Sequence, residues 1–213
     1  IATNTINYLK SEGIKEINYL IITHGDFDHI GEAENLINNY KIKNIILNSH
    51  QNNSLEDAVV NLAHKKHIPC KNINEGYLKI NKYKLKFLKS NSQTENEDSL
   101  IIYTKMNNQN ILLMGDAGEE REKYILKEYN LPKMDILKVG HHGSKHSTSP
   151  RFVNQIEPKI SLISAGRNNL YGHPHKELLA RLEDSKLLIT QIDGSVKIVL
   201  KKRTIYYTCP LMR

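Results

Sequence analysis

The chain has 213 residues and a formal net charge of +7, and 39% of its residues are hydrophobic. This length and apolar content suit one domain with a substantial core and exclude a disordered chain. No apolar run approaches the roughly 20 residues that a membrane span needs, so we expect no transmembrane segment in this chain. The excess of Lys and Arg suits either simple solubility or a polyanionic partner. We therefore expect a single domain over residues 1–213.

The beginning of the chain is informative as well. It starts at Ile1 rather than at a methionine, and no basic segment followed by an apolar one stands there, as a secretory signal would require. We therefore expect the chain to be part of a longer protein.

Helical and strand-like segments alternate along the first half of the chain. The near-continuous apolar run at 17–23 is typical of a buried strand, and a second such run stands at 42–47. Helical spacing of apolar residues indicates helices at 5–9, 30–40 and 54–64, with Ser54 as the N-cap of the last.

The rest of the chain opens with strands and then alternates again. The patterns predict strands at 77–88, 100–105 and 110–114, with a hairpin turn at 107–109, then a helix at 119–129, a strand at 135–139, a helix that begins at Pro150, a strand at 160–163 and a helix at 174–182. Two or three closing strands follow between 187 and 207, with Asp193-Gly194 as a hairpin turn. This order of elements predicts an α/β sandwich in which helices cover the sheets.

The histidines are placed unevenly along the chain. Seven of the ten lie in three short segments rich in Gly, Ser and Asp: His24, His29, His141, His142, His146, His173 and His175. Several of these segments follow predicted strands. Loops at strand ends are where α/β proteins build their sites, so the clustering predicts a functional centre.

The first of these segments reads THGDFDHIG from Thr23 to Gly31. It places His24, Asp26, Asp28 and His29 within six residues. Two carboxylates about 4 Å apart repel each other by roughly 4 kcal/mol, and a divalent cation removes that cost. Imidazole and carboxylate together suit Zn, Mn or Fe. The competing interpretation is a polar loop in which Asp28 caps the following helix.

Two further segments add candidate ligands. Asp116 follows a buried strand, although such a residue taken alone more often caps a helix. His141 and His142 are adjacent and flanked by glycines, so their side chains should diverge. We expect one of them to bind metal and the other to face substrate, and the sequence does not distinguish the two. The competing interpretation is a pair of surface histidines in a flexible loop.

The last segment runs from Gly166 to His175. It makes His173 a candidate metal ligand and Arg167 and Asn169 candidate phosphate-binding residues, because a guanidinium offers a fork of donors. Lys145 is a further candidate for contact with an anionic substrate. The alternation KYKLKF at 82–87 would place three lysines on one strand face, either for a polyanion or as a solvated face over a buried stripe.

Together these motifs resemble a known family. The run from His24 to His29 resembles the His-x-His-x-Asp-His motif of the metallo-β-lactamase superfamily, with Asp26 in place of the second His. The His-His-Gly-Ser segment at 141–144 and the Asn-x-Tyr-Gly-His-Pro segment at 169–174 resemble ComEC-type competence-protein domains. The resemblance implies a metallo-β-lactamase-like αββα sandwich, with Asp116 as a carboxylate shared by two metal ions.

The resemblance also implies a ligand set for two divalent ions, Mn or Zn. One ion would be held by His24, Asp26, Asp116 and one of His141 and His142. The other would be held by Asp28, His29, Asp116 and His173. The candidate catalytic residues are Asp28, His141 and His142, with the spare histidine of the pair protonating the leaving group.

The chain departs from the family pattern in two places. A further His ligand is expected between the first motif and Asp116, but the matching segment, Asn96 to Leu100, contains none. Either Asn96 or Asp98 substitutes, or one of His141 and His142 completes that site, which we favour because it keeps a neutral nitrogen donor. The first N-terminal strands of the family are also absent from this chain.

The function implied is a dinuclear metal-dependent phosphodiesterase or nuclease that acts on single-stranded DNA during competence-related uptake. The parent protein would then be membrane-embedded, with this chain as its soluble domain; a free-standing soluble or exported protein is the alternative. Two other functions compete with this one. One is hydrolysis of a small ester, thioester or phosphocholine substrate, and the other is a non-catalytic DNA-binding module with a vestigial metal site.

Overall fold

A seven-stranded mixed sheet forms the centre of the molecule. The computed structural model describes residues 4–48, 53–89, 92, 94, 96–201 and 204–208. The strand order is β12-β11-β10-β9-β8-β7-β6. Neighbours from β6 to β9 are antiparallel and neighbours from β9 to β12 are parallel. The strands are β6 (Gly76–Ile80), β7 (Tyr83–Leu88), β8 (Ile101–Met106), β9 (Gln109–Leu113), β10 (Ile136–Lys138), β11 (Ile160–Ile163) and β12 (Lys186–Ile189).

A smaller parallel sheet packs on one face of the large one. It has the order β2-β4-β5, and a short parallel pair, β1 with β3, is formed by the neighbouring segments. The side chains of Ile46 and Ile73 from the small sheet meet Leu85, Phe87 and Ile102 from the large one. The strands are β1 (Glu16–Ile17), β2 (Leu20–Ile21), β3 (Lys41–Ile42), β4 (Ile45–Asn48) and β5 (Cys70–Ile73).

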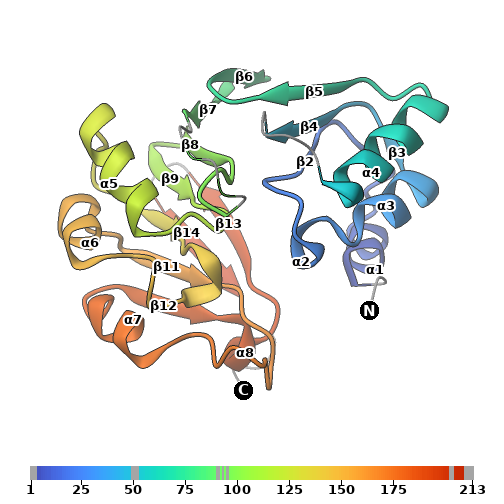
Figure 1. Cartoon of the computed structure of the whole chain (residues 1–213). Coiled ribbons are helices and arrows are strands. Elements are labelled where there is room, and N and C mark those ends of the chain that lie inside the picture. Colours follow the sequence, from blue (N-terminus) through green and yellow to red (C-terminus); the bar gives the residue numbers. More distant parts are fainter. Residues whose placement is uncertain are drawn as a thin grey trace.

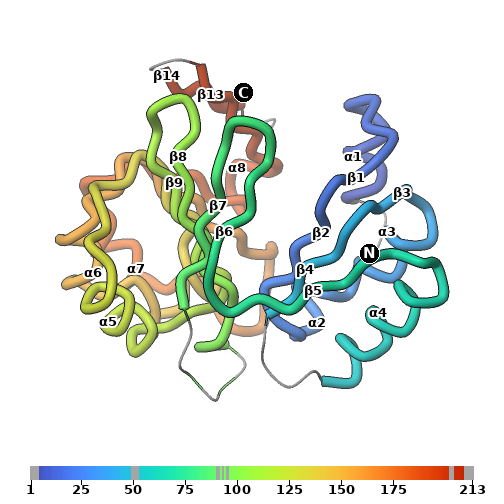
Figure 2. The backbone as a smooth tube through the Cα atoms, turned by 90° about the horizontal axis from the view of Figure 1, so that it is seen from above, coloured from blue at the N-terminus to red at the C-terminus, as the bar shows by residue number. Residues whose placement is uncertain are grey.

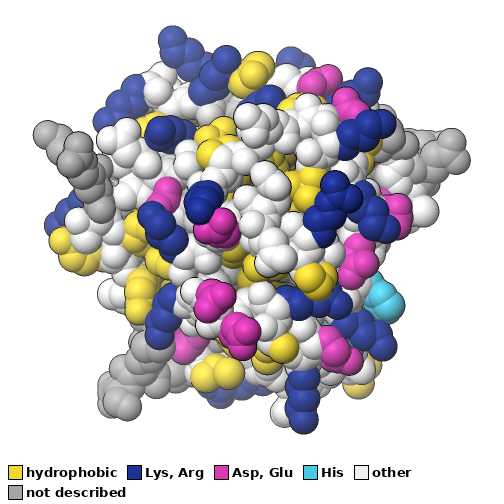
Figure 3. Space-filling model, turned by 90° about the vertical axis from the view of Figure 1, so that its left-hand side faces the viewer, with side chains coloured by type: hydrophobic (Ala, Val, Ile, Leu, Met, Phe, Trp, Pro, Cys, Tyr) yellow, Lys and Arg dark blue, Asp and Glu magenta, His cyan; other side chains and the backbone are white. Residues whose placement is uncertain are grey.

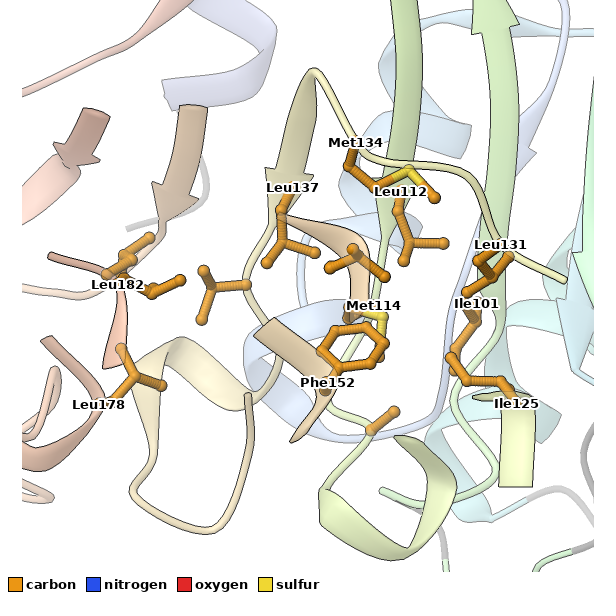
Figure 4. Close-up of a cluster of buried hydrophobic side chains, with 14 of the residues drawn as sticks. Ile101, Leu112, Met114, Ile125, Leu131, Met134, Leu137, Phe152, Leu178 and Leu182 are labelled. Carbon is orange, nitrogen blue, oxygen red and sulfur yellow. The ribbon is translucent and has the colours of Figure 1, made fainter. Parts of the chain in front are cut away.

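Helices cover the outer faces of both sheets (Figures 1 and 2). The N-terminal helices pack on the small sheet, where Leu36 and Val59 meet Ile45. The later helices pack on the large sheet, where Ile125 and Phe152 meet Leu112 (Figure 4). The layers are therefore helices, sheet, sheet and helices, which confirms the expected α/β sandwich. The helices are α1 (Asn4–Ser11), α2 (Phe27–Ile30), α3 (Ala33–Asn39), α4 (Ser54–Lys65), α5 (Glu119–Glu128), α6 (Pro150–Ile156) and α7 (Lys176–Arg181).

The C-terminal part of the chain covers a further part of the large sheet, which the small sheet and the helices leave open. β13 (Lys197–Lys201) and β14 (Thr204–Thr208) form an antiparallel hairpin. Its Ile198 and Leu200 pack with Ile136 and Leu188 of the large sheet. The expected hairpin turn at Asp193-Gly194 was wrong, because Asp193 ends a short helix, α8 (Thr190–Asp193).

Two predicted elements of the first half are divided in the structure. The strand expected at 17–23 is split into β1 and β2, because the chain bends at Asn18, a residue that does not favour a strand. The neighbouring strands β3 and β4 are likewise separated, at residues 43–44. The helix expected at 30–40 begins earlier and is interrupted at Gly31, a poor helix former, so that α2 and α3 are separate. The N-cap of α4 is Asn53 rather than Ser54.

One predicted strand of the middle region is a hairpin. Residues 77–88 form β6 and β7, and the chain turns at Asn81, which adopts a positive φ of 52°. Asparagine tolerates that backbone conformation, so it can serve as a turn residue. Lys82 therefore lies in the turn, while Lys84 and Lys86 share one face of β7. β5 has no counterpart among the sequence predictions.

Candidate metal centre

The candidate ligands meet at one edge of the two sheets. The first motif follows β2 directly, Asp116 follows β9, and His142 follows β10 in a short 3-10 helix (His141–Gly143). β9 and β10 are parallel neighbours, so their ends bring Asp116 and His142 together. The Thr23 carbonyl accepts a hydrogen bond from the Leu100 amide (3.0 Å), which joins the motif loop to the start of β8.

Four side chains converge at this edge. Ligand atoms of Asp28, His29, Asp116 and His142 all lie within 4.8 Å of one another. The Nε2 atom of His142 lies 2.9 Å from a carboxylate oxygen of Asp28 and 3.4 Å from one of Asp116. The Nε2 atom of His29 lies 3.1 Å from the other oxygen of Asp116. Two carboxylates and two imidazoles at these separations form a donor set that suits a divalent ion such as Zn or Mn.

A second pair of side chains, His24 and Asp26, lies next to this group. The Nε2 atom of His24 is 3.6 Å from Asp26 and 3.9 Å from Asp116. The rings of His24 and His29 are 4.1 Å apart. His24 approaches the same Asp116 oxygen as His142, so this carboxylate is close to both sets of candidate ligands.

The far ring nitrogens of these histidines are held by oxygen atoms. The Nδ1 atom of His142 donates to the Ser164 carbonyl at 2.8 Å. The Nδ1 atom of His24 lies 3.0 Å from Thr23 Oγ1 and 3.2 Å from Ser99 Oγ. Such bonds orient each ring so that Nε2 faces the carboxylates, which is the arrangement of metal-ligating histidines.

Ser99 also contacts the central carboxylate residue. Its hydroxyl accepts a hydrogen bond from the Asp116 amide at 3.1 Å, while it holds His24 on its other side. Gly115 makes this approach possible: a Cβ there would lie 2.8 Å from the Cβ of Ser99, and its φ is +55°. Sequence reasoning missed Ser99, although it lies in the segment where a further His ligand was expected.

The pKa values at the centre reflect this crowding. Burial alone would raise the pKa of Asp116, but hydrogen bonds from His142 and His29 outweigh it and hold that pKa far below its usual range. The same bond to Asp116 raises the pKa of His142. Asp116 is thus a carboxylate at neutral pH, held in that form by hydrogen bonds from the two imidazoles.

The backbone at the histidine pair is strained. His141 and His142 have φ values of 46° and 52°, in the left-handed region that non-glycine residues seldom adopt. Strain of this kind persists only where surrounding structure enforces it, and it often marks functional sites. The conformation separates the two side chains, and only His142 lies against the carboxylates. The ring centre of His141 lies 6.5 Å from that of His142 and 5.7 Å from that of His173.

A cavity of about 540 Å³ opens above the carboxylates. His141, His173, Asn96 and Tyr171 line its wall. The Tyr171 ring stacks on His173 at 5.7 Å. Burial lowers the pKa of His173, and the neighbouring His175 lowers it further. His173 therefore lies on the cavity wall, and His142 takes the place beside Asp28 and His29 that we had expected for His173.

The residues expected to bind substrate differ in position. Asn169 lines the cavity, but its side chain is bonded to backbone: it donates to the carbonyls of Gly166 (2.9 Å) and His173 (2.7 Å) and accepts from the His173 amide (2.8 Å). It orders the loop that carries His173. The Arg167 Nε donates to the Gln191 carbonyl at 3.2 Å.

Lys145 and Arg167 are not among the described residues that line the cavity. Lys145 is exposed, and its amide donates to the Nδ1 atom of His175 at 3.1 Å. Asn96 rather than Asp98 faces the cavity, because Asp98 is only 6% exposed and lies in a different hollow.

A further positioning residue lies at the start of α4. Asn53 caps that helix together with Glu56. Its side-chain Nδ2 atom also donates to the Gly25 carbonyl in the motif loop, at 3.0 Å. The capping interpretation of Asp28 does not hold, since Asp28 lies inside α2 and the N-cap of α2 is Asp26, which makes no side-chain capping bond. The motif loop is thus held from outside, with its carboxylates turned to the centre.

Comparison with known proteins agrees with this geometry. Residues 2–167 match the family model described as the metallo-beta-lactamase superfamily. The chain belongs to this superfamily. It is 33% identical over 205 residues to ComE operon protein 3 of Bacillus subtilis, with 93% of this chain and 26% of that protein covered. It is 30% identical over 193 residues to Recombination protein 2 of Haemophilus influenzae, with 90% and 23% covered.

The relatives confirm the resemblance to competence proteins, and a third, competence protein ComA of Neisseria gonorrhoeae, is 25% identical over 205 residues. The chain spans about a quarter of the length of these relatives. A crystal structure from Parabacteroides distasonis, named as a candidate metal-dependent hydrolase, has the same fold, with a TM-score of 0.54, 16% identity, and 83% of this chain and 77% of that one covered. Within the described residues, no helix has the length and apolar character of a membrane span.

Proposed function

We propose that this superfamily domain is a two-metal phosphodiesterase that cleaves single-stranded DNA during DNA uptake. The observation that carries the proposal is the convergence of Asp28, His29, Asp116 and His142, of which all but His29 line an open cavity. The competence relatives support the biological setting. The relatives are about four times as long as this chain, and the proposal places the chain as one domain of a longer, membrane-embedded parent protein.

The proposal divides the candidate ligands between two ions. Asp28, His29 and His142 would hold one ion, His24 and Asp26 the other, with Asp116 between them. When bound, such ions supply positive charge to the phosphate oxygens and lower the pKa of water. Three carboxylates and three imidazoles suit Mn or Zn.

The remaining residues orient the ligands and handle the substrate. Thr23 and Ser99 fix the His24 ring, and the Ser164 carbonyl fixes that of His142. His141 faces the cavity without joining the carboxylates, so it is the histidine of the pair placed to donate a proton to the leaving oxygen. His173, beside it, would contact the substrate from the same wall.

A cleavage assay tests this function. The purified chain, freed of metal by chelation, is given Mn or Zn and a fluorescent single-stranded oligonucleotide, with p-nitrophenyl acetate as the small-ester alternative. We expect metal-dependent cleavage of DNA that Asp28→Asn abolishes, with little ester turnover. Ester hydrolysis without DNA cleavage would favour the small-substrate hydrolase. DNA binding that survives Asp28→Asn, with no turnover in either variant, would favour the binding module.

A further inference from the structure

A second hollow, of about 370 Å³, shares no lining residue with the cavity of the metal centre. It lies beside α5, and its lining includes Glu97, Glu120, Arg121, Lys123, Tyr124 and Lys127. α5 and the neighbouring helices form the face seen in Figure 3, across which Lys and Arg side chains are distributed. The hollow is unusual because one of its cations is buried.

Arg121 is only 2% exposed. Its Nη2 atom donates to the Leu88 carbonyl at 2.8 Å, but its buried Nε and Nη1 atoms have no hydrogen-bond partner among the residues that the structure describes. Burial lowers the pKa of this guanidinium, and an arginine in a protein stays charged nonetheless. Buried, unpaired donors of a cation are costly, so these atoms call for an anionic partner.

The carboxylates of the hollow are already engaged. Glu97 accepts a hydrogen bond from the Arg121 backbone amide at 2.9 Å, and Glu120 pairs with Lys123 at 2.5 Å. Within the described part of the chain, Arg121 and Lys127 form no ion pair with a carboxylate, although the nearby charges of Asp98 and Glu97 act to raise the pKa of Arg121. The Tyr124 ring lies 5.3 Å from the guanidinium. Two donors of one guanidinium with a nearby ammonium suit a phosphate, whose oxygens accept such a fork.

Pairs of lysine and tyrosine continue from this hollow along β7. Lys86 lies over the ring of Tyr129, which ends α5, at 4.4 Å, and Lys84 lies over the ring of Tyr77 at 3.4 Å. Lys84 also stands directly opposite Lys79 in the β6–β7 ladder. Like charges directly opposite each other destabilise a hairpin, and an anion on this face would remove the cost.

The structure assigns the Arg121 hollow as a phosphate-binding subsite for single-stranded nucleic acid, which the Lys–Tyr pairs of β7 extend. Regularly spaced phosphates would meet the cations, and unstacked bases would meet the tyrosine rings. The assignment rests on the proposed function for the identity of the polyanion. The binding itself needs no metal ion, so the two can be tested separately.

The test is fluorescence anisotropy of a labelled 20-residue oligothymidylate with metal-free protein in chelator. We expect Arg121→Gln and the double variant Lys84→Gln/Lys86→Gln to weaken binding at least about fivefold, and each lost phosphate contact to reduce the salt dependence by about 0.7 in log–log slope. Lys127→Gln should weaken binding in the same direction. Lys186→Gln, which removes the same charge at the exposed start of β12, should bind as the unaltered protein does.

Two outcomes would overturn the assignment. One is unaltered binding in both Lys127→Gln and the double lysine variant. Because neither variant changes Arg121, this outcome can be observed even if Arg121→Gln does not fold. The other is the absence of binding by the metal-free protein. Asp116→Asn separates this question from the proposed function: it should abolish cleavage and leave anisotropy unchanged.

Discussion

Asp116 and Glu122 are both buried carboxylates, 3% and 1% exposed, and their pKa values move in opposite directions. Burial raises the pKa of Glu122 to about 7, although the amides of Thr148 and Ser149 donate to it. Burial acts on Asp116 in the same sense, but two imidazoles reverse the shift. The comparison shows that burial raises the pKa of a carboxyl group even where backbone amides donate to it, whereas hydrogen bonds from two imidazoles keep Asp116 ionised.

The histidines of the site also fall into two groups, which differ in what their rings contact. His24, His29 and His142 face carboxylates through Nε2, while His141 and His173 face each other across the cavity wall. We infer that the first group holds metal and the second contacts substrate. The variants below test both contrasts.

The largest effect is expected for Asp116→Asn. The change removes the charge shared by both groups of donors, so metal binding should be lost and turnover should fall by more than about 100-fold. Metal content and DNA cleavage measure this. Asp135→Asn is the matched control: Asp135 is a partly buried carboxylate that pairs with the exposed Lys159 at 2.7 Å and contacts none of the candidate ligands, so this variant should retain both properties.

A large effect on metal affinity is expected for His142→Gln but not for His173→Gln. The first removes a donor 2.9 Å from Asp28, and affinity should fall at least about 100-fold. The second should keep metal affinity and lose turnover, because His173 lies on the cavity wall. Calorimetric titration with Mn distinguishes them, and loss of metal in His173→Gln would return that residue to the ligand set.

Ser99→Ala should have an intermediate effect. It removes the hydroxyl that contacts the His24 ring and accepts from the Asp116 amide, and residues that orient ligands typically contribute about 10–100-fold in metal affinity. Ser161→Ala removes a buried serine hydroxyl that bonds only to Ser185 among the bonds described, and it serves as control. Equal metal affinity in both variants would exclude a role for Ser99 at the centre.

The smallest effect on activity is expected for Glu122→Gln, which should instead change how the melting temperature depends on pH. Its folded pKa of about 7 lies above the ordinary 4.5, so the folded state binds its proton more tightly. The contribution of Glu122 to the free energy of unfolding is therefore greatest below pH 4.5. It falls as the pH rises towards 7, by about 3 kcal/mol in total. Glu122→Gln should flatten the dependence of the melting temperature on pH between 5 and 8, and a slope equal to that of the unaltered protein would contradict this account.

The meeting of the candidate ligands at one edge of the sheets was largely predictable from the sequence, because these residues stand in short motifs directly after strands. The choice of His142 over His141 was not, since it depends on the left-handed backbone of the pair. Ser99 and Asn53 act through contacts with residues distant in the chain, and no local pattern marks them. The division of predicted elements at Gly31 and Asn81 likewise depends on single turn residues inside otherwise regular patterns.

The burial of Arg121 could not be predicted from the sequence either. In the sequence it is one charge among many on α5, and only the fold buries it against Leu88.

The most direct test of the shared-carboxylate centre is a count of tightly bound Mn or Zn per chain, by plasma mass spectrometry after metal addition and dialysis. The account predicts two ions in the unaltered chain, a loss of both in Asp116→Ala, and one remaining ion in His142→Gln. A single ion in the unaltered chain, or two ions retained in Asp116→Ala, would contradict it.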